Sequence, residues 1–241
     1  MSRARTALSK KHPLAIRWFH WVNVPLVFLM LWSGLMIYWA SPVYRLGAGG
    51  RTLIGFFPDW FFNLLRAPYR LAEGMSLHFF FMWFFLVNGV LYVTYTALSG
   101  EWRYLVPDRR SYGEAVRVVL HELGLSKTEP PPRRFNGAQQ IAYSLVIVMG
   151  AASIVTGLSI YKPTQLAWLT RLVGGYERAR WIHFWLAAGY VVFFVIHVTE
   201  VARAGWNNFR AMVTGYEIAT APPSSTAASP AASEPAKGTS P

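Results

Sequence analysis

The sequence contains no cysteine. Disulfides, thiolate zinc sites, thiolate-bound iron–sulfur clusters and covalently attached c-type haem are therefore excluded. Acidic side chains are also few, with 11 Asp and Glu against 23 Lys and Arg, and charged residues make up only 14% of the 241 residues. A metal or cofactor in this protein must be held by histidine, methionine, carboxylate or backbone groups.

Apolar and aromatic residues, by contrast, are abundant. Hydrophobic residues make up 54% of the chain and aromatic residues 16%, which is too apolar for an ordinary soluble domain. Four runs exceed the roughly 20 residues that a helix needs to cross a bilayer. They cover about residues 14–40, 76–98, 138–161 and 180–203. We therefore predict an all-α integral membrane protein built as a four-helix bundle.

The basic residues predict how this bundle is oriented. Fifteen of the 23 Lys and Arg lie in the N-terminal arm, the 99–137 loop and the C-terminal tail. The positive-inside rule therefore places both termini and this loop in the cytoplasm. The net charge of +12 comes with no nucleic-acid-binding motif, so no nucleic acid partner is expected. The predicted organisation is a cytoplasmic arm over 1–13, a membrane domain over 14–217 and a disordered Ala-, Pro- and Ser-rich tail over 218–241.

The two long loops have distinct compositions. The outer loop contains an aromatic segment, residues 52–71, which is too short to span and is expected to lie at the membrane interface or to form a small cap. The inner loop carries a predicted amphipathic helix over 112–125, started by Ser111 and stopped near Gly124. The proline run at 130–132 is expected to be a stiff connector into the third span.

Four of the six histidines lie in the predicted spans, at two depths. Fourteen residues separate His183 from His197, so a helix places both on faces within roughly 40° of each other and about 21 Å apart. With the predicted orientation, His197 is level with His20 near the inner side, and His183 is level with His78 near the outer side. A lone membrane histidine is often only a hydrogen-bonded packing or headgroup residue. Two pairs at matched depths fit two bis-imidazole haem irons within the bundle.

A zinc site and a proton channel fit the two histidine pairs less well than haem does. Zinc needs three or four ligands at one point, which two separated pairs do not supply. A proton channel uses carboxylates inside the membrane, where Glu200 is the only acidic residue of the predicted spans. Gly34 and Gly89 lie on the faces of His20 and His78, each at the level of the other pair. They either make room for a haem or allow close packing of the helices.

Several segments carry a family resemblance: RWFHW at 17–21, WNNFRAMVTGYE at 206–217, and the positions of His78, His183 and His197. Together they resemble the di-haem b-type cytochrome membrane subunits of formate dehydrogenase, nickel–iron hydrogenase and thiosulfate-reductase-like complexes. The resemblance covers about residues 10–217. It implies two b-type haems, with the first-helix histidine paired to the inner fourth-helix histidine and the second-helix histidine to the outer one. The implied axial ligands are therefore His20 and His197 at the inner haem and His78 and His183 at the outer haem.

The resemblance also implies a role. Such subunits sit in the bacterial inner membrane and carry electrons between a quinone and a redox enzyme on the periplasmic side, which here implies a partner of the molybdenum-cofactor type. The segment FNGAQQ at 135–140 matches the family's quinone-site segment, with Asn136 as the candidate quinone ligand and Gln140 where relatives often carry Lys. The alternative for Asn136 is a helix N-cap. Arg17 pairs with a haem propionate or anchors the first helix at the headgroups.

Two other functions use the same sequence features. A stand-alone membrane cytochrome b that oxidises superoxide or a small reductant would need the same four histidines. A haem-free structural membrane anchor would need none of them. The sequence shows no substrate pocket of its own, and the chemistry of the favoured interpretation belongs to the haems. The main hypothesis is therefore an electron-transfer subunit of a quinone-linked oxidoreductase.

Overall fold

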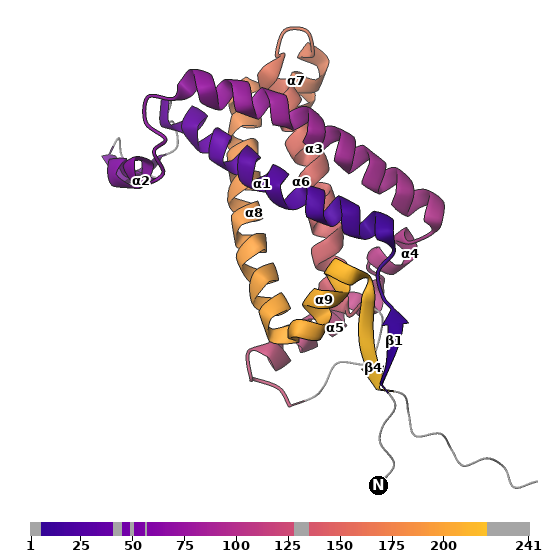
Figure 1. Ribbon diagram of the computed structural model, residues 1–241. Coiled ribbons are helices and arrows are strands. Elements are labelled where there is room, and N and C mark those ends of the chain that lie inside the picture. The colour runs from indigo at the N-terminus through magenta and orange to yellow at the C-terminus, as the bar shows by residue number, and fades with distance from the viewer. Residues whose placement is uncertain (1–5, 41–44, 49–50, 56, 128–134, 221–241) are drawn as a thin grey trace, which may run out of the picture. The chain divides into compact units, whose positions relative to one another are not determined.

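Four long helices form the framework of the computed structural model, which describes residues 6–40, 45–48, 51–55, 57–127 and 135–220 (Figure 1). Each of the four is long and apolar enough to cross a membrane. They are α1 (Leu14–Ala40), α3 (Leu71–Ser99), α6 (Gly137–Tyr161) and α8 (Tyr176–Ala204). The predicted helical membrane bundle is confirmed. Helices α3 and α8 begin earlier than the predicted 76 and 180, because their first turns carry charged residues that the apolar runs do not include.

Helices α1 and α3 run side by side (Figure 1). A glycine permits their close approach, because a Cβ atom on Gly74 would lie only 2.6 Å from Met36 Cβ. A polar contact joins the same two helices, with the buried Asn88 Nδ2 donating to Asn23 Oδ1 at 2.8 Å. Many apolar side chains of the long helices remain exposed, for example Val87 at 54%. Such surfaces suit contact with lipid rather than water.

The outer loop folds into a small cap, as one of the two expectations stated. Strands β2 (Arg45–Ala48) and β3 (Arg51–Gly55) pair antiparallel, and the short helix α2 (Asp59–Leu64) follows. The buried Phe62 of α2 packs in one hydrophobic cluster with Met36 of α1. Phe57, just before α2, lies edge to face against Phe184 of α8, with ring centroids 6.4 Å apart. The cap therefore contacts the ends of two long helices. A further short helix, α7 (Ala167–Val173), lies between α6 and α8 in the chain.

The inner loop contains α4 (Trp102–Leu105) and α5 (Arg109–Glu122). The expectation that Ser111 starts the second of these helices is wrong, because Asp108 is the N-cap and Ser111 is the third helical residue of a capping box. Both residue types cap helices well, so the local sequence leaves the choice open. Ser111 Oγ also contacts Gln140 Oε1 of α6 at 2.6 Å, which fixes α5 against α6. The proline run at 130–132 lies outside the described residues.

The N-terminal arm and the C-terminal segment form a separate unit. Strand β1 (Thr6–Lys10) pairs antiparallel with β4 (Tyr216–Thr220), and α9 (Trp206–Thr214) precedes β4. Lys11 Nζ donates to Glu217 Oε2 at 2.7 Å and to Asn208 Oδ1 at 3.2 Å. The sequence predicted neither strand, because their pairing joins segments about 200 residues apart. The ordered strand β4 passes the predicted start of the disordered tail at 218, and residues 221–241 of that tail lie outside the described part of the chain.

Candidate functional site

The four membrane histidines form two pairs. The ring centroids of His20 on α1 and His197 on α8 are 6.0 Å apart. Those of His78 on α3 and His183 on α8 are 6.2 Å apart. Helix α8 thus contributes one imidazole to each pair. Helix α1 completes the pair with His197, and α3 completes the pair with His183. The structure brings together the same partners that the depth argument and the resemblance paired.

The spacing of both pairs fits two imidazoles on one metal ion. An imidazole nitrogen lies about 2.0–2.1 Å from a bound transition metal and about 1.1 Å from its own ring centroid, so two opposed imidazoles have centroids about 6.3 Å apart. The observed 6.0 and 6.2 Å agree with this value. Among the residues that the structure describes, no three His, Cys, Asp or Glu side chains gather around one point. Each candidate centre therefore offers two nitrogen donors, the number that a haem iron needs axially.

Hydroxyl groups contact the outer pair from neighbouring helices. Ser33 Oγ of α1 lies 2.9 Å from His78 Nδ1, and Thr156 Oγ1 of α6 lies 2.9 Å from His183 Nδ1. Both hydroxyl residues are buried. With each Nδ1 occupied in this way, the other nitrogen of each ring, Nε2, remains to bind a metal, as is usual for metal-ligating histidines. The sequence reasoning missed both hydroxyl residues.

An aromatic ring lies against each imidazole of the inner pair. The His197 ring stacks on Phe193, with centroids 5.6 Å apart and planes 9° from parallel. The His20 ring meets Trp21 edge to face at 5.1 Å. These contacts restrict the rotation of both imidazoles and place an apolar group against each of them. A low-dielectric, apolar environment is one of the means by which a protein tunes a haem.

Glycines make room for the outer imidazoles. A Cβ atom on Gly34 would lie 3.6 Å from His78 Cε1, and a Cβ atom on Gly157 would lie 3.3 Å from His183 Cε1. Gly34 is thus at the level of the outer pair, where the sequence placed it, and it faces an imidazole. A Cβ atom on Gly89 would meet no heavy atom of the described chain within 4 Å. The sequence reasoning missed Gly157, because it considered glycines only on α1 and α3.

The candidate quinone residues lie where α5 meets α6. Asn136 is the N-cap of α6: its side chain accepts a hydrogen bond from the Gln139 backbone N–H at 2.9 Å. Gln140, at the position where relatives often carry Lys, donates to the Tyr104 carbonyl at 3.1 Å and so has a structural contact. As the N-cap, Asn136 uses its Oδ1 atom. The predicted hydrogen bond to a quinone would come from its Nδ2 amide group. Arg17 lies half-buried in the first turn of α1, and its predicted propionate contact stays a prediction.

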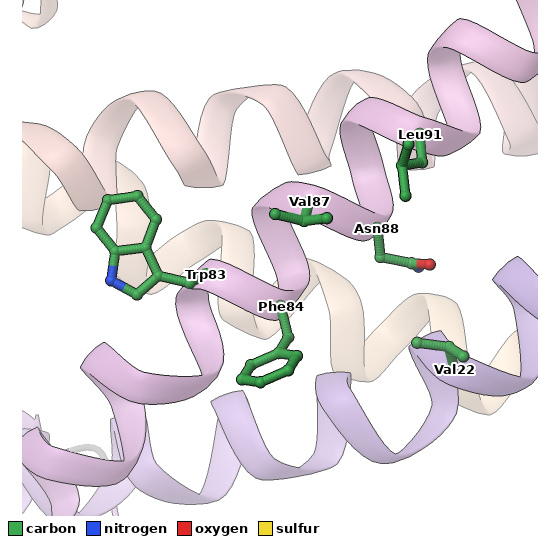
Figure 2. Close-up of a pocket in the computed structure, with 6 residues that line it drawn as sticks. All are labelled: Val22, Trp83, Phe84, Val87, Asn88 and Leu91. Carbon is green, nitrogen blue, oxygen red and sulfur yellow. The ribbon is translucent and has the colours of Figure 1, made fainter.

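An apolar pocket of about 420 Å³ lies on another face of α3 (Figure 2). Its wall consists of one α1 residue and five α3 residues: Val22, Trp83, Phe84, Val87, Asn88 and Leu91. Val87 follows His78 by nine residues, which places it about 180° around the helix from that histidine. The pocket therefore faces away from the histidine pairs and belongs to the outer, lipid-type surface of α1 and α3.

Three of the four membrane helices carry the two imidazole pairs, and this arrangement defines a helical membrane protein with two candidate nitrogen-donor sites. The chain belongs to the prokaryotic cytochrome b561 family, which it matches over residues 11–215. It is also 31% identical over 192 residues to a protein of Azospira oryzae named as protein-methionine-sulfoxide reductase subunit YedZ1. That match covers 79% of this chain and 89% of the relative.

Family membership has three consequences. It confirms the resemblance to b-type cytochrome membrane subunits and implies that the chain binds b-type haem. With the four membrane-spanning helices, it indicates a multi-pass protein of the bacterial inner membrane. It also identifies the chain as a membrane electron-transfer subunit of the cytochrome b561 type.

Proposed function

We propose that this chain carries electrons across the membrane through two b-type haems, between a quinone and a periplasmic oxidoreductase. In this proposal His20 and His197 are the axial ligands of the inner haem, and His78 and His183 are those of the outer haem. The observation that supports it best is the presence of two imidazole pairs, each at the spacing of one iron, on a shared helix. The haems supply the one-electron chemistry when bound.

The chain's own residues hold and insulate the two centres. Four imidazoles would supply neutral nitrogen donors. Hydroxyls of neighbouring helices contact the two outer imidazoles, and Phe193 of the same helix stacks on His197. Fourteen residues of α8 separate His183 from His197, or about 21 Å of helix, so the two sites lie at opposite depths of one span. Trp21 and Phe193 place an aromatic ring against His20 and His197, and apolar groups beside a haem are one of the means that tune it.

The relative's name suggests the class of partner. The Azospira oryzae protein is named as a subunit of a protein-methionine-sulfoxide reductase. We propose a redox enzyme of this kind, of the molybdenum-cofactor type that the resemblance implies, bound at the outer end where the aromatic cap lies. Affinity purification of the chain from its native membrane tests this. Recovery of a periplasmic reductase supports the proposal, whereas a chain that purifies alone and oxidises superoxide would favour the stand-alone cytochrome.

Rapid mixing with a quinol tests the route of electrons. In the wild-type chain a quinol is expected to reduce both haems. In His197→Ala, which lacks the inner haem in this proposal, the outer haem should be reduced more slowly than in the wild type, because the quinone is proposed to react at the inner side. Stopped-flow absorption at the b-type bands measures both rates. If quinol reduces the outer haem of His197→Ala at the wild-type rate, the proposed route is contradicted.

Substitutions of Asn136 can separate its role as the N-cap of α6 from its proposed role at the quinone. Asp caps a helix as well as Asn, so Asn136→Asp should retain the stability of α6 while removing the amide donor. We expect this variant to weaken quinol reactivity with an unchanged melting temperature. Asn136→Gly, which costs only a few tenths of a kcal/mol at an N-cap, is the matched variant without any side chain. If both variants react with quinol like the wild type, Asn136 is a cap only.

A further inference from the structure

Two buried hydroxyls reach the outer histidines from helices that do not carry those histidines. Ser33 on α1 contacts His78 of α3, and Thr156 on α6 contacts His183 of α8, each with 2.9 Å between the hydroxyl oxygen and Nδ1. The exposed fractions are 1% for Ser33 and 3% for Thr156. The outer pair is therefore held by all four membrane helices, two through imidazoles and two through hydroxyls.

Both hydroxyl groups donate their protons to carbonyl oxygens of their own helices. Ser33 Oγ donates to the Leu29 carbonyl at 2.6 Å, and Thr156 Oγ1 donates to the Ala152 carbonyl at 2.7 Å. A carbonyl oxygen only accepts, and an oxygen–oxygen distance this short requires a proton between the two atoms. A hydroxyl has one proton, so toward the imidazole each hydroxyl oxygen must act as the acceptor. The donor in both contacts is therefore the Nδ1–H group.

This direction fixes the tautomer of both rings. A neutral imidazole carries one proton, so an Nδ1–H donor leaves Nε2 with its lone pair. We propose that Ser33 and Thr156 are the positioning residues of the outer haem site: they hold His78 and His183 as Nδ1–H tautomers with Nε2 toward the iron, and they lower the reduction potential of that haem. The inference rests on the proposed axial ligation.

The effect on the potential follows from the hydrogen bond. A ligand imidazole that donates its second N–H becomes more basic and a stronger donor to the metal. A stronger donor stabilises the oxidised iron relative to the reduced iron, so the bond lowers the potential. At the inner site His197 packs against the face of Phe193. The hydroxyls are thus expected to act on the outer haem alone.

Two variants remove the hydroxyls without removing a ligand. We expect each of Ser33→Ala and Thr156→Val to raise the midpoint potential of the outer haem and to leave that of the inner haem unchanged. Valine keeps the shape of the threonine side chain. The affinity of the chain for the outer haem should fall by about 10-fold, the lower end of the range for such partners. Redox titration followed by absorption and low-spin electron paramagnetic resonance measures the two haems separately. Ser33→Thr and Thr156→Ser retain a hydroxyl and should restore wild-type behaviour.

A nearby serine supplies the control. Ser159 is fully buried on α6 and donates to the Val155 carbonyl at 2.8 Å, the same type of bond that Thr156 makes within its helix. Ser159→Ala therefore reproduces the loss of an intrahelical hydroxyl bond and should leave both haems as in the wild type. If Ser33→Ala does not accumulate in the membrane, Thr156→Val against Ser159→Ala decides the question.

Three results would overturn the inference. They are an outer potential that neither variant shifts, an equal shift of both haems, and an effect of Ser159→Ala as large as that of Thr156→Val. Failure of the proposed function has a different signature, because the wild-type chain would then lack two haems before any substitution is made. A wild-type chain with two haems and unresponsive hydroxyl variants would refute only the role of Ser33 and Thr156.

Discussion

His183→Ala and His197→Ala are expected to remove different haems. Each substitution deletes one axial imidazole, and an iron left with a single protein ligand loses most of its affinity for the site. The haem content should fall by half in each variant, with loss of the outer haem in His183→Ala and of the inner haem in His197→Ala. The absorption difference spectra of the two variants should add up to the wild-type spectrum.

A third histidine provides the matched control. His121 lies in α5, outside the pairs, and its Nδ1 atom contacts the Ser126 carbonyl at 3.1 Å. His121→Ala should therefore retain both haems. Loss of the same haem in His183→Ala and His197→Ala would contradict the assignment of one α8 histidine to each pair. So would two haems in either variant.

Gly157→Val is expected to abolish outer haem binding while it leaves the inner haem in place. A Cβ atom at this position would already lie 3.3 Å from His183 Cε1, which is closer than most Cβ contacts. The two methyl groups of valine extend further, so the imidazole has to leave the position in which Thr156 holds it. Overpacking of this kind costs about 1–3 kcal/mol in a packed site. The haem content and the outer-haem spectrum of the purified variant measure the result.

Gly113→Ala serves as the comparison. Gly113 lies in α5, outside the membrane helices, and a Cβ atom there would meet no heavy atom of the described chain within 4 Å, so alanine should be accepted with both haems retained. An outer haem that survives Gly157→Val with its wild-type spectrum would show that His183 does not need the position seen here.

The features that the sequence predicted are those that depend on neighbouring residues along one helix. Apolar runs reveal a span because a span is a local property. The fourteen-residue spacing of His183 and His197 predicts a shared face because helix geometry converts sequence distance directly into angle and depth. The partners His20 and His78 followed from the orientation of the spans. The structure brings the same pairs of rings together at 6.0 and 6.2 Å.

The features that the sequence did not predict depend on how helices are rotated against each other. Serine and threonine are common in membrane helices, so nothing marks Ser33 or Thr156 until their helices pack against α3 and α8. The same holds for Gly157, whose role depends on the position of one imidazole. The sequence did not predict strands β1 and β4 for a related reason. Each strand is short, and its pairing partner lies at the other end of the chain.

The haem content of the wild-type chain tests the central claim most directly. Purified protein should contain two b-type haems per chain, determined from the absorption of the extracted haem against the protein concentration. Both haems should be reducible and should titrate as two one-electron steps. A content of one haem would contradict the two-site account, since both histidine pairs offer the spacing for an iron. Absence of haem would contradict the proposed function as a whole.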